Sequence, residues 1–361
     1  MVKHSKMVKK YDDVATASGV KERLESALGP VPFVKVREVR EQDRVSDRPA
    51  VDFLVDVRAA GAPITFLIEV KSQAQPRLVR MAAAELQYLV KTVPNSYGIL
   101  MAPYFSPASF EICREAGIGC VDFSGNARLS FKNVFIEKTG LPNLFPEERP
   151  LRSLFSPKTS RGLRVLFSGP SETWHVERIA ALAGISLGLA SKVKQMLLAQ
   201  DWIKEKGRGF VLANPSGLLE EWSKSYSYKR NRAASYYGAL SENDLERALK
   251  EEAEKTSFRY GLALFSGARK VAPFVRFPRF FAYVEKSIEG TANALSLKKV
   301  DSGANVTLLE PYDEGVLLGL QDINGVKVVS DIQLYLDLKS YGGRGEDAAR
   351  AVYEQRIRPR W

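Results

Sequence analysis

The sequence predicts an α/β protein with an N-terminal mixed sheet with helices, a central winged helix-turn-helix and a C-terminal α+β domain. Helix-like and strand-like segments alternate over residues 10–145, a pattern typical of a sheet covered by helices. Residues 151–225 follow a helix, turn, helix and hairpin order, which is typical of a winged helix. Strands mix with helices again over residues 240–361. We therefore expect three domains with these boundaries.

Length and composition favour a globular protein without a membrane anchor. The chain has 361 residues, which is too long for a single ordinary hydrophobic core. Hydrophobic residues make up 45% and charged residues 26%, a composition typical of globular and not of disordered proteins. No apolar run reaches the roughly 18 residues of a membrane span, and the basic start "MVKHSKMVKK" lacks the apolar core of a secretion signal. Two cysteines (Cys113, Cys120) and two histidines (His4, His175) disfavour a disulfide scaffold and a structural zinc site. We expect a cytoplasmic protein.

Positive charge is concentrated in the middle of the chain. The net charge is +11. Residues 156–232 contain 13 lysines and arginines against 6 acidic residues, an excess of +7. A local field of this sign favours a polyanionic partner such as duplex DNA.

The N-terminal part is divided by turn signals. We expect a helix over residues 12–28, because Val20, Leu24 and Leu28 recur at helical spacing. Strands follow at 51–58 and 64–71, joined by the turn "AGAP". The next expected elements are a helix at 77–92, the buried strand "SYGILMA", the Ser-capped helix "SPASFEICREAG" and the strand region "GCVDFSGNARLSF". "GLPNLFPEERP", with three prolines, reads as a linker.

The triplet Glu69-Val70-Lys71 ends the second of these strands. Residues i and i+2 of a strand share a face, so Glu69 and Lys71 point the same way. With Asp52 on the preceding strand, two carboxylates can hold Mg²⁺ or Mn²⁺, and Lys71 can steady a nucleophile or a developing charge. Asp56 is an alternative to Asp52, since both share a strand face. A third carboxylate can come from the first helix, although surface charge is the simpler interpretation of its two candidates, Glu22 and Glu25.

The helix after the triplet adds to this pattern. Arg77, Arg80, Gln87 and Lys91 fall on one arc, separate from the apolar arc of Val79, Ala83, Leu86 and Val90. The set resembles the RecB-like nucleases of the PD-(D/E)xK, restriction endonuclease-like fold, which carry a Gln on this helix. Where those nucleases have a Tyr four residues later, this chain has Lys91. The resemblance implies a catalytic set of Asp52, Glu69, Lys71 and Gln87, with Asp52 and Glu69 as metal ligands and Arg77 and Arg80 facing DNA phosphates. The same fold used as an inert scaffold, and a plain α/β domain with a solvated helix face, remain open.

The basic block predicts a DNA-binding helix and wing. One helix is expected from a cap at Ser171 to Gly184, a second in "ISLGLASKVKQMLLAQ", and a hairpin in "DWIKEKGRGFVLANP". In the second helix, the apolar face is formed by Leu189, Val193, Met196 and Leu197. Its polar face carries Ser191, Lys192 and Gln195, with Lys194 at the edge, and such side chains can reach bases and phosphates in a major groove. Arg208 at the hairpin tip suits a backbone or minor-groove contact. A winged helix used only for protein contacts is the alternative.

Several longer strings resemble one family. "GLALFSGARKVAPFVRF", "ANVTLLEPYDEGVLLG" and "VVSDIQLYLDLKSYGGRGEDAA" resemble the C-terminal domain of AbiEi-type antitoxins of type IV toxin–antitoxin systems. "EAGIGCVDFSGNARLSF" and "SPKTSRGLRVLFSG" are similar to the earlier parts of long members of that group. The resemblance implies a bacterial transcriptional regulator that binds promoter DNA through a winged helix. It also implies a nucleotidyltransferase-like toxin as functional partner, and a homodimer stays open.

Two functions and a simpler third follow from these patterns. The first is a DNA-binding antitoxin and regulator with a nuclease-like N-terminal domain. The second is a Mg²⁺- or Mn²⁺-dependent DNA endonuclease delivered to DNA by its winged helix, and only this function requires a metal. The third is a toxin-binding scaffold without a DNA role. The sequence leaves open whether the protein is an enzyme.

Overall fold

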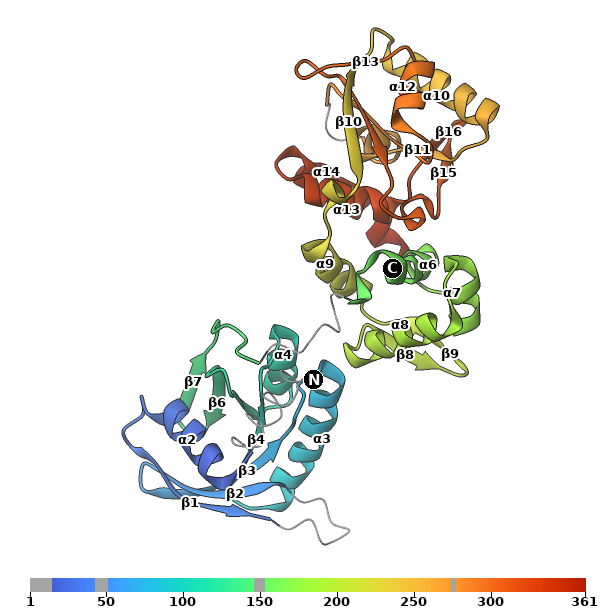
Figure 1. The fold of residues 1–361 in the computed structure, drawn as a ribbon. Coiled ribbons are helices and arrows are strands. Elements are labelled where there is room, and N and C mark those ends of the chain that lie inside the picture. Colours follow the sequence, from blue (N-terminus) through green and yellow to red (C-terminus); the bar gives the residue numbers. More distant parts are fainter. Residues whose placement is uncertain (1–14, 43–50, 146–152, 274–276) are drawn as a thin grey trace, which may run out of the picture. The chain divides into compact units, whose positions relative to one another are not determined.

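The computed structural model of the chain describes residues 15–42, 51–145, 153–273 and 277–361 (Figure 1). The chain divides into two compact units, Met1–Glu148 and Arg149–Trp361. The first residues of the predicted N-terminal domain (10–14), the second part of the proline-rich linker (146–150) and the first residues of the predicted central domain (151–152) lie outside the described residues. Within the described ranges, no helix is both long enough and apolar enough to span a membrane.

Unit 1 is built on a seven-stranded mixed sheet in which the strands lie side by side in chain order. The strands are β1 (Val34–Glu41), β2 (Phe53–Ala59), β3 (Ala62–Val70), β4 (Ser96–Ala102), β5 (Gly119–Asp122), β6 (Ala127–Phe131) and β7 (Val134–Lys138). Neighbours are antiparallel except β3, β4 and β5, which run parallel. The turn between β2 and β3 holds Ala60 and Gly61 at positive φ, where glycine is favoured. The predicted N-terminal mixed sheet with helices is confirmed.

Helices cover both faces of this sheet. They are α2 (Ala17–Leu28), α3 (Pro76–Thr92) and α4 (Pro107–Glu115). Because successive strand residues point to opposite faces, β3 sends Phe66 and Ile68 into the core under α2, and Leu67 into the core under α3 and α4. Ser106 caps α4 by accepting a hydrogen bond from the Ser109 amide, as predicted.

Unit 2 begins with helices and a hairpin. The elements are α6 (Pro157–Ser168), α7 (Val176–Ala183), α8 (Leu187–Ala199), β8 (Ile203–Lys206), β9 (Gly209–Leu212) and α9 (Pro215–Ser225). Gly184 ends α7 in the left-handed conformation, at φ 60°. The predicted cap at Ser171 is wrong, because α7 begins only at Val176. The reason is an antiparallel bridge between Trp174 and Phe210, which keeps the chain extended beside the hairpin.

A second seven-stranded mixed sheet follows, in the order β13-β10-β14-β12-β11-β16-β15. Its strands are β10 (Arg232–Tyr237), β11 (Tyr260–Leu262), β12 (Phe280–Val284), β13 (Lys298–Lys299), β14 (Val306–Glu310), β15 (Gln321–Ile323) and β16 (Val326–Val328). The helices are α10 (Glu242–Thr256), α11 (Leu264–Val271), α12 (Ile288–Ala294), α13 (Asp331–Tyr341) and α14 (Arg344–Val352), and the short helical turns are η1 (Tyr228–Arg230), η2 (Glu314–Leu317), η3 (Tyr353–Ile357) and η4 (Arg358–Arg360). Figure 1 shows α13 and α14 beside α9.

The helical segment and the second sheet share one hydrophobic core, which runs from Leu154 to Ile357. Polar contacts cross the same junction. Arg161 of α6 donates two hydrogen bonds to Asp313, at 2.8 and 2.7 Å. The buried Arg164, also on α6, donates to Oε1 of Gln333 on α13 at 2.6 Å. The two predicted segments 151–225 and 240–361 therefore pack as parts of one unit.

Candidate functional site

Asp52, directly before β2, lies beside Glu69 near the end of β3. The register pairs Phe53 with Ile68, so the preceding residue, Asp52, lies opposite Glu69. Oδ2 of Asp52 accepts a hydrogen bond from the Val70 amide at 2.7 Å. The structure thus brings together the two carboxylates that the sequence proposes as metal ligands.

Lys71 belongs to the same group. Its Nζ donates to Oε1 of Glu69 at 2.6 Å. Glu69 is only 5% exposed, and a carboxylate so deeply buried needs a compensating charge. Glu69 and Lys71 point the same way, as the strand period predicts.

Other carboxylates lie elsewhere. Asp56, the alternative to Asp52 as a metal ligand, forms an ion pair with Arg40 at 2.8 Å. Arg40 lies on β1, which neighbours β2 on the side away from β3. Glu25 lies 4.0 Å from Lys21 on the surface of α2, and Glu22 is exposed on the same helix. In the part of the chain that the structure describes, no group of three or more His, Cys, Asp or Glu side chains could hold a metal ion.

Helix α3 follows the triplet, and it buries the predicted apolar arc at Val79, Ala83 and Leu86. The polar arc is exposed, with Arg77, Arg80, Gln87 and Lys91 on it. Nε2 of Gln87 donates to the carbonyl of Ala116 at 2.6 Å. Since helices rise 1.5 Å per residue, Gln87 lies about 16 Å along α3 from its first residue. The structure therefore does not bring Gln87 to the triplet.

Asp122 is a buried carboxylate that the sequence analysis does not single out. It ends β5, and its two oxygens accept hydrogen bonds from the backbone and side-chain amides of Asn126, both at 2.8 Å. Burial raises its pKa. The spacing Asp-x-x-Gly-Asn, typical of a turn, is the sequence signal for it. Its bonds indicate that it holds the β5–β6 turn.

Helix α8 presents the predicted polar face to solvent. Ser186 caps the helix, accepting from the Leu189 amide, and Val193 and Leu197 are buried. The residues exposed on the opposite side include Ser191, Lys192 and Gln195. This helix therefore offers a hydroxyl, an ammonium and an amide from a rigid element.

Lys194 has a different role from its neighbours. Its Nζ lies 3.2 Å from Oε1 of Glu205 on β8 and 5.7 Å from the centre of the Phe210 ring. Its side chain is only 20% exposed. Lys194 thus ties α8 to the hairpin.

The hairpin tip is basic and exposed. Gly207 takes φ 58°, and Arg208 beside it is exposed. Lys204 and Lys206 are exposed as well, on alternate residues of β8. These two lysines are not among the residues predicted to bind DNA. The period of two in "IKEK" is the signal that places both lysines on the face opposite Glu205.

A family comparison covers the later part of the chain. Residues 211–358 match a family model described as "Transcriptional regulator, AbiEi antitoxin, Type IV TA system". The match runs from the end of β9 through α9 and the second sheet, and includes neither unit 1 nor α6 to α8. No curated protein and no solved structure matches the chain.

Proposed function

We propose that this protein is a DNA-binding transcriptional regulator that acts as the antitoxin of a type IV toxin–antitoxin system. The match of residues 211–358 to the AbiEi antitoxin model carries this proposal. A nucleotidyltransferase-like toxin is then its functional partner, as the sequence resemblance implies. No direct contact with the toxin is needed for this function.

The proposal assigns DNA reading to the segment from α6 to β9, acting as a winged helix. Three helices followed by an antiparallel hairpin, with Trp174 paired to the hairpin, support the assignment. α8 is then the recognition helix. Ser191, Lys192 and Gln195 on its exposed face have the side chains that contact phosphates and base edges. Arg208 on the hairpin then contacts the DNA backbone beside the groove that α8 enters.

The test is a fluorescence-anisotropy titration of the full-length protein with duplex DNA from upstream of its own gene. A shuffled duplex of the same length is the comparison. We expect tighter binding to the upstream duplex, and affinity that falls steeply between about 50 and 200 mM salt because counterions are released. Equal affinity for both duplexes, or affinity that does not change with salt, contradicts the proposal.

A second candidate function is a metal-dependent endonuclease activity of unit 1. The juxtaposition of Asp52, Glu69 and Lys71 favours it. The order α2-β1-β2-β3-α3-β4, with β3 and β4 parallel, is consistent with the nuclease-like fold proposed from the sequence.

Two adjacent carboxylates suffice for Mg²⁺, which keeps several waters and takes few protein ligands. Asp52 and Glu69 would hold the ion, which would polarise a phosphate and activate water. Lys71 would lie beside the phosphate. The test is incubation of supercoiled plasmid with the protein and Mg²⁺ or Mn²⁺, with EDTA as the control. Nicking that EDTA abolishes is expected, and an intact plasmid under every metal contradicts this candidate.

A further inference from the structure

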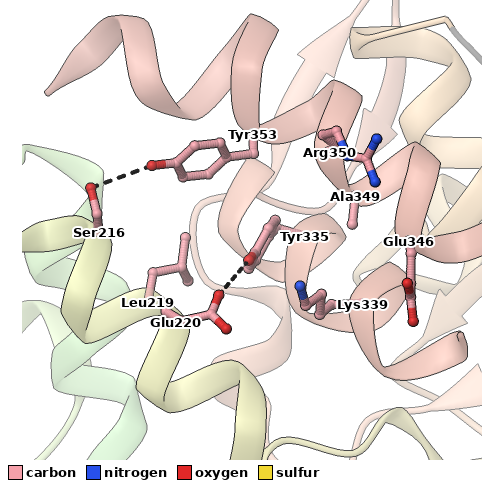
Figure 2. A pocket seen from close by; sticks show the side chains of 9 residues that line it. All are labelled: Ser216, Leu219, Glu220, Tyr335, Lys339, Glu346, Ala349, Arg350 and Tyr353. Atoms are coloured by element: carbon pink, nitrogen blue, oxygen red, sulfur yellow. Dashed lines mark hydrogen bonds between the residues drawn. The ribbon is translucent and has the colours of Figure 1, made fainter. Parts of the chain in front are cut away.

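A cavity of about 320 Å³ opens where α9 faces α13, α14 and η3 (Figure 2). α9 contributes one side, and the C-terminal helices contribute the other. Its lining consists of Ser216, Leu219, Glu220, Tyr335, Lys339, Glu346, Ala349, Arg350 and Tyr353. This volume lies at the lower end of the range for small-molecule sites.

Aromatic and aliphatic groups form the apolar part of the lining. Leu219 and Ala349 lie with the rings of Tyr335 and Tyr353 around the cavity. The Tyr353 hydroxyl bonds to Oγ of Ser216 at 3.3 Å, which fixes the ring against α9. Such a surface suits an apolar side chain of modest size.

Tyr335 adds a fixed polar group. Its hydroxyl donates to Oε2 of Glu220 at 3.4 Å. Burial, together with the charge of Glu220, raises the pKa of Tyr335 to about 12. The phenol is therefore neutral at physiological pH and remains a hydrogen-bond donor at the edge of the cavity.

The charged groups of the lining are balanced and weakly engaged. Lys339 and Arg350 are the cations, and Glu220 and Glu346 are the anions. Arg350 reaches Asp347 only at 3.7 Å. Among the described residues, neither Lys339 nor Glu346 has an ion pair within 4.0 Å. A lining of zero net charge disfavours a phosphate or a nucleotide, and it leaves one anchor of each sign for a ligand.

We propose that this cavity binds a zwitterionic small molecule of the α-amino acid class. Lys339 and Arg350 receive the carboxylate, Glu346 and Glu220 receive the ammonium, and the side chain lies against Leu219 and the tyrosine rings. The ligand contacts α9 and the C-terminal helices together. Ligand binding therefore stabilises the packing of α9 against the C-terminal helices. The proposed ligand site is separate from the proposed DNA-binding function and does not depend on it.

The experiment uses the full-length protein without DNA. Each of the twenty L-amino acids is tested at millimolar concentration by thermal shift, and those that raise the Tm are titrated by calorimetry. We expect at least one amino acid to bind with a stoichiometry of one. Its N-acetyl derivative lacks the ammonium and its amide lacks the carboxylate. Each should bind about tenfold to a hundredfold more weakly, because each loses a charge-assisted hydrogen bond.

Two variants at exposed cavity residues test whether binding occurs there, and a third variant outside the cavity is the control. Lys339→Gln and Glu346→Gln should each weaken binding by at least about tenfold, while Lys298→Gln on β13, away from the cavity, should bind as the parent does. The circular dichroism spectrum and Tm of each free variant verify its fold. The proposal is overturned if no amino acid binds or if the N-acetyl derivative binds as well as the free amino acid. It is also overturned if Lys339→Gln and Glu346→Gln both bind the amino acid as tightly as the unmodified protein does.

Discussion

The hydroxyl of Tyr226, at the end of α9, donates a hydrogen bond of 2.6 Å to Oδ1 of Asp337 in the middle of α13. Asp337 is fully buried. Tyr283 of β12 lies 3.1 Å from both carboxylate oxygens, and Gln333 donates at 2.9 Å. The carboxylate therefore connects the end of α9 with α13 and the second sheet, through neutral donors.

The first prediction concerns the pH dependence of stability. Burial raises the pKa of Asp337 to about 7 from the ordinary 3.8, against the lowering effect of its hydrogen bonds and of Arg164. Between pH 4 and 7 the folded state thus retains a proton that the unfolded chain has lost. This contribution is complete below pH 4 and is lost as the pH rises through 7, with a slope of about 1.4 kcal/mol per pH unit.

Urea denaturation across pH 4 to 8 measures it. Asp337→Asn cannot titrate, so the stability of this variant relative to the parent should rise with pH over that window. Parallel stability curves for the two proteins would rule out titration of Asp337 in this range.

The second prediction concerns the contact between Arg161 and Asp313. Their side chains are only 14% and 10% exposed, and the pair is bidentate. Asp313→Ala leaves the largely buried guanidinium with only the exposed Glu314 as an ionic partner, so we expect a loss of about 2–4 kcal/mol in the free energy of unfolding. Glu289→Ala breaks the exposed pair with Arg232 and should cost clearly less, because exposed ion pairs contribute little to stability. Equal losses in urea denaturation would show that the buried pair does not stabilise the junction.

Local patterns predict several elements because their signals lie within a few residues. Helical periodicity correctly assigns the buried face of α3, and Ser106 and Gly184 mark helix ends by capping chemistry. By contrast, β1 and β7 are not among the predicted elements. Both lie at the edges of the first sheet, where exposed charged residues such as Arg37 and Glu137 obscure an alternating pattern.

Contacts between residues far apart in the sequence explain the features that local patterns do not predict. Gln87 bonds to Ala116, Trp174 pairs with Phe210, and Arg161 reaches Asp313, 152 residues away. Periodicity within one helix gives the direction of a side chain but not its partner. The sequence therefore predicts that Asp52 and Glu69 lie near each other, whereas it cannot show that Gln87 bonds to Ala116.

The third prediction separates sequence reading from general affinity in the proposed winged helix. Gln195→Ala should reduce the preference for the upstream duplex over the shuffled one, since an amide–base pair discriminates by about 1–3 kcal/mol. Lys192→Gln and Arg208→Gln should weaken binding to both duplexes and lower the salt slope by about 1 each. Lys224→Gln on α9, where the lysine pairs with Glu221, is the control and should leave binding unchanged. A Gln195→Ala protein with unchanged affinity and preference would show that this face of α8 does not read bases.

The fourth prediction addresses the triplet at the end of β3. Glu69→Ala should abolish any metal-dependent cleavage, because one of the two carboxylates is lost. DNA affinity should remain close to that of the parent, since the proposed winged helix supplies most of it. Plasmid nicking and fluorescence anisotropy on the same preparation measure both properties, with circular dichroism to verify the fold.

Asp56→Ala is the matched control for this experiment. Asp56 is 41% exposed and pairs with Arg40, so its removal should cost less than about 1 kcal/mol of stability and leave cleavage intact. Loss of cleavage in Asp56→Ala but not in Asp52→Ala would make Asp56 the second ligand. If the parent protein cleaves nothing with Mg²⁺ or Mn²⁺, the bond between Lys71 and Glu69 has a different consequence. It then neutralises a buried carboxylate in a scaffold, and Glu69→Gln, which removes that charge but keeps the shape, should change the free energy of unfolding less than Glu69→Ala.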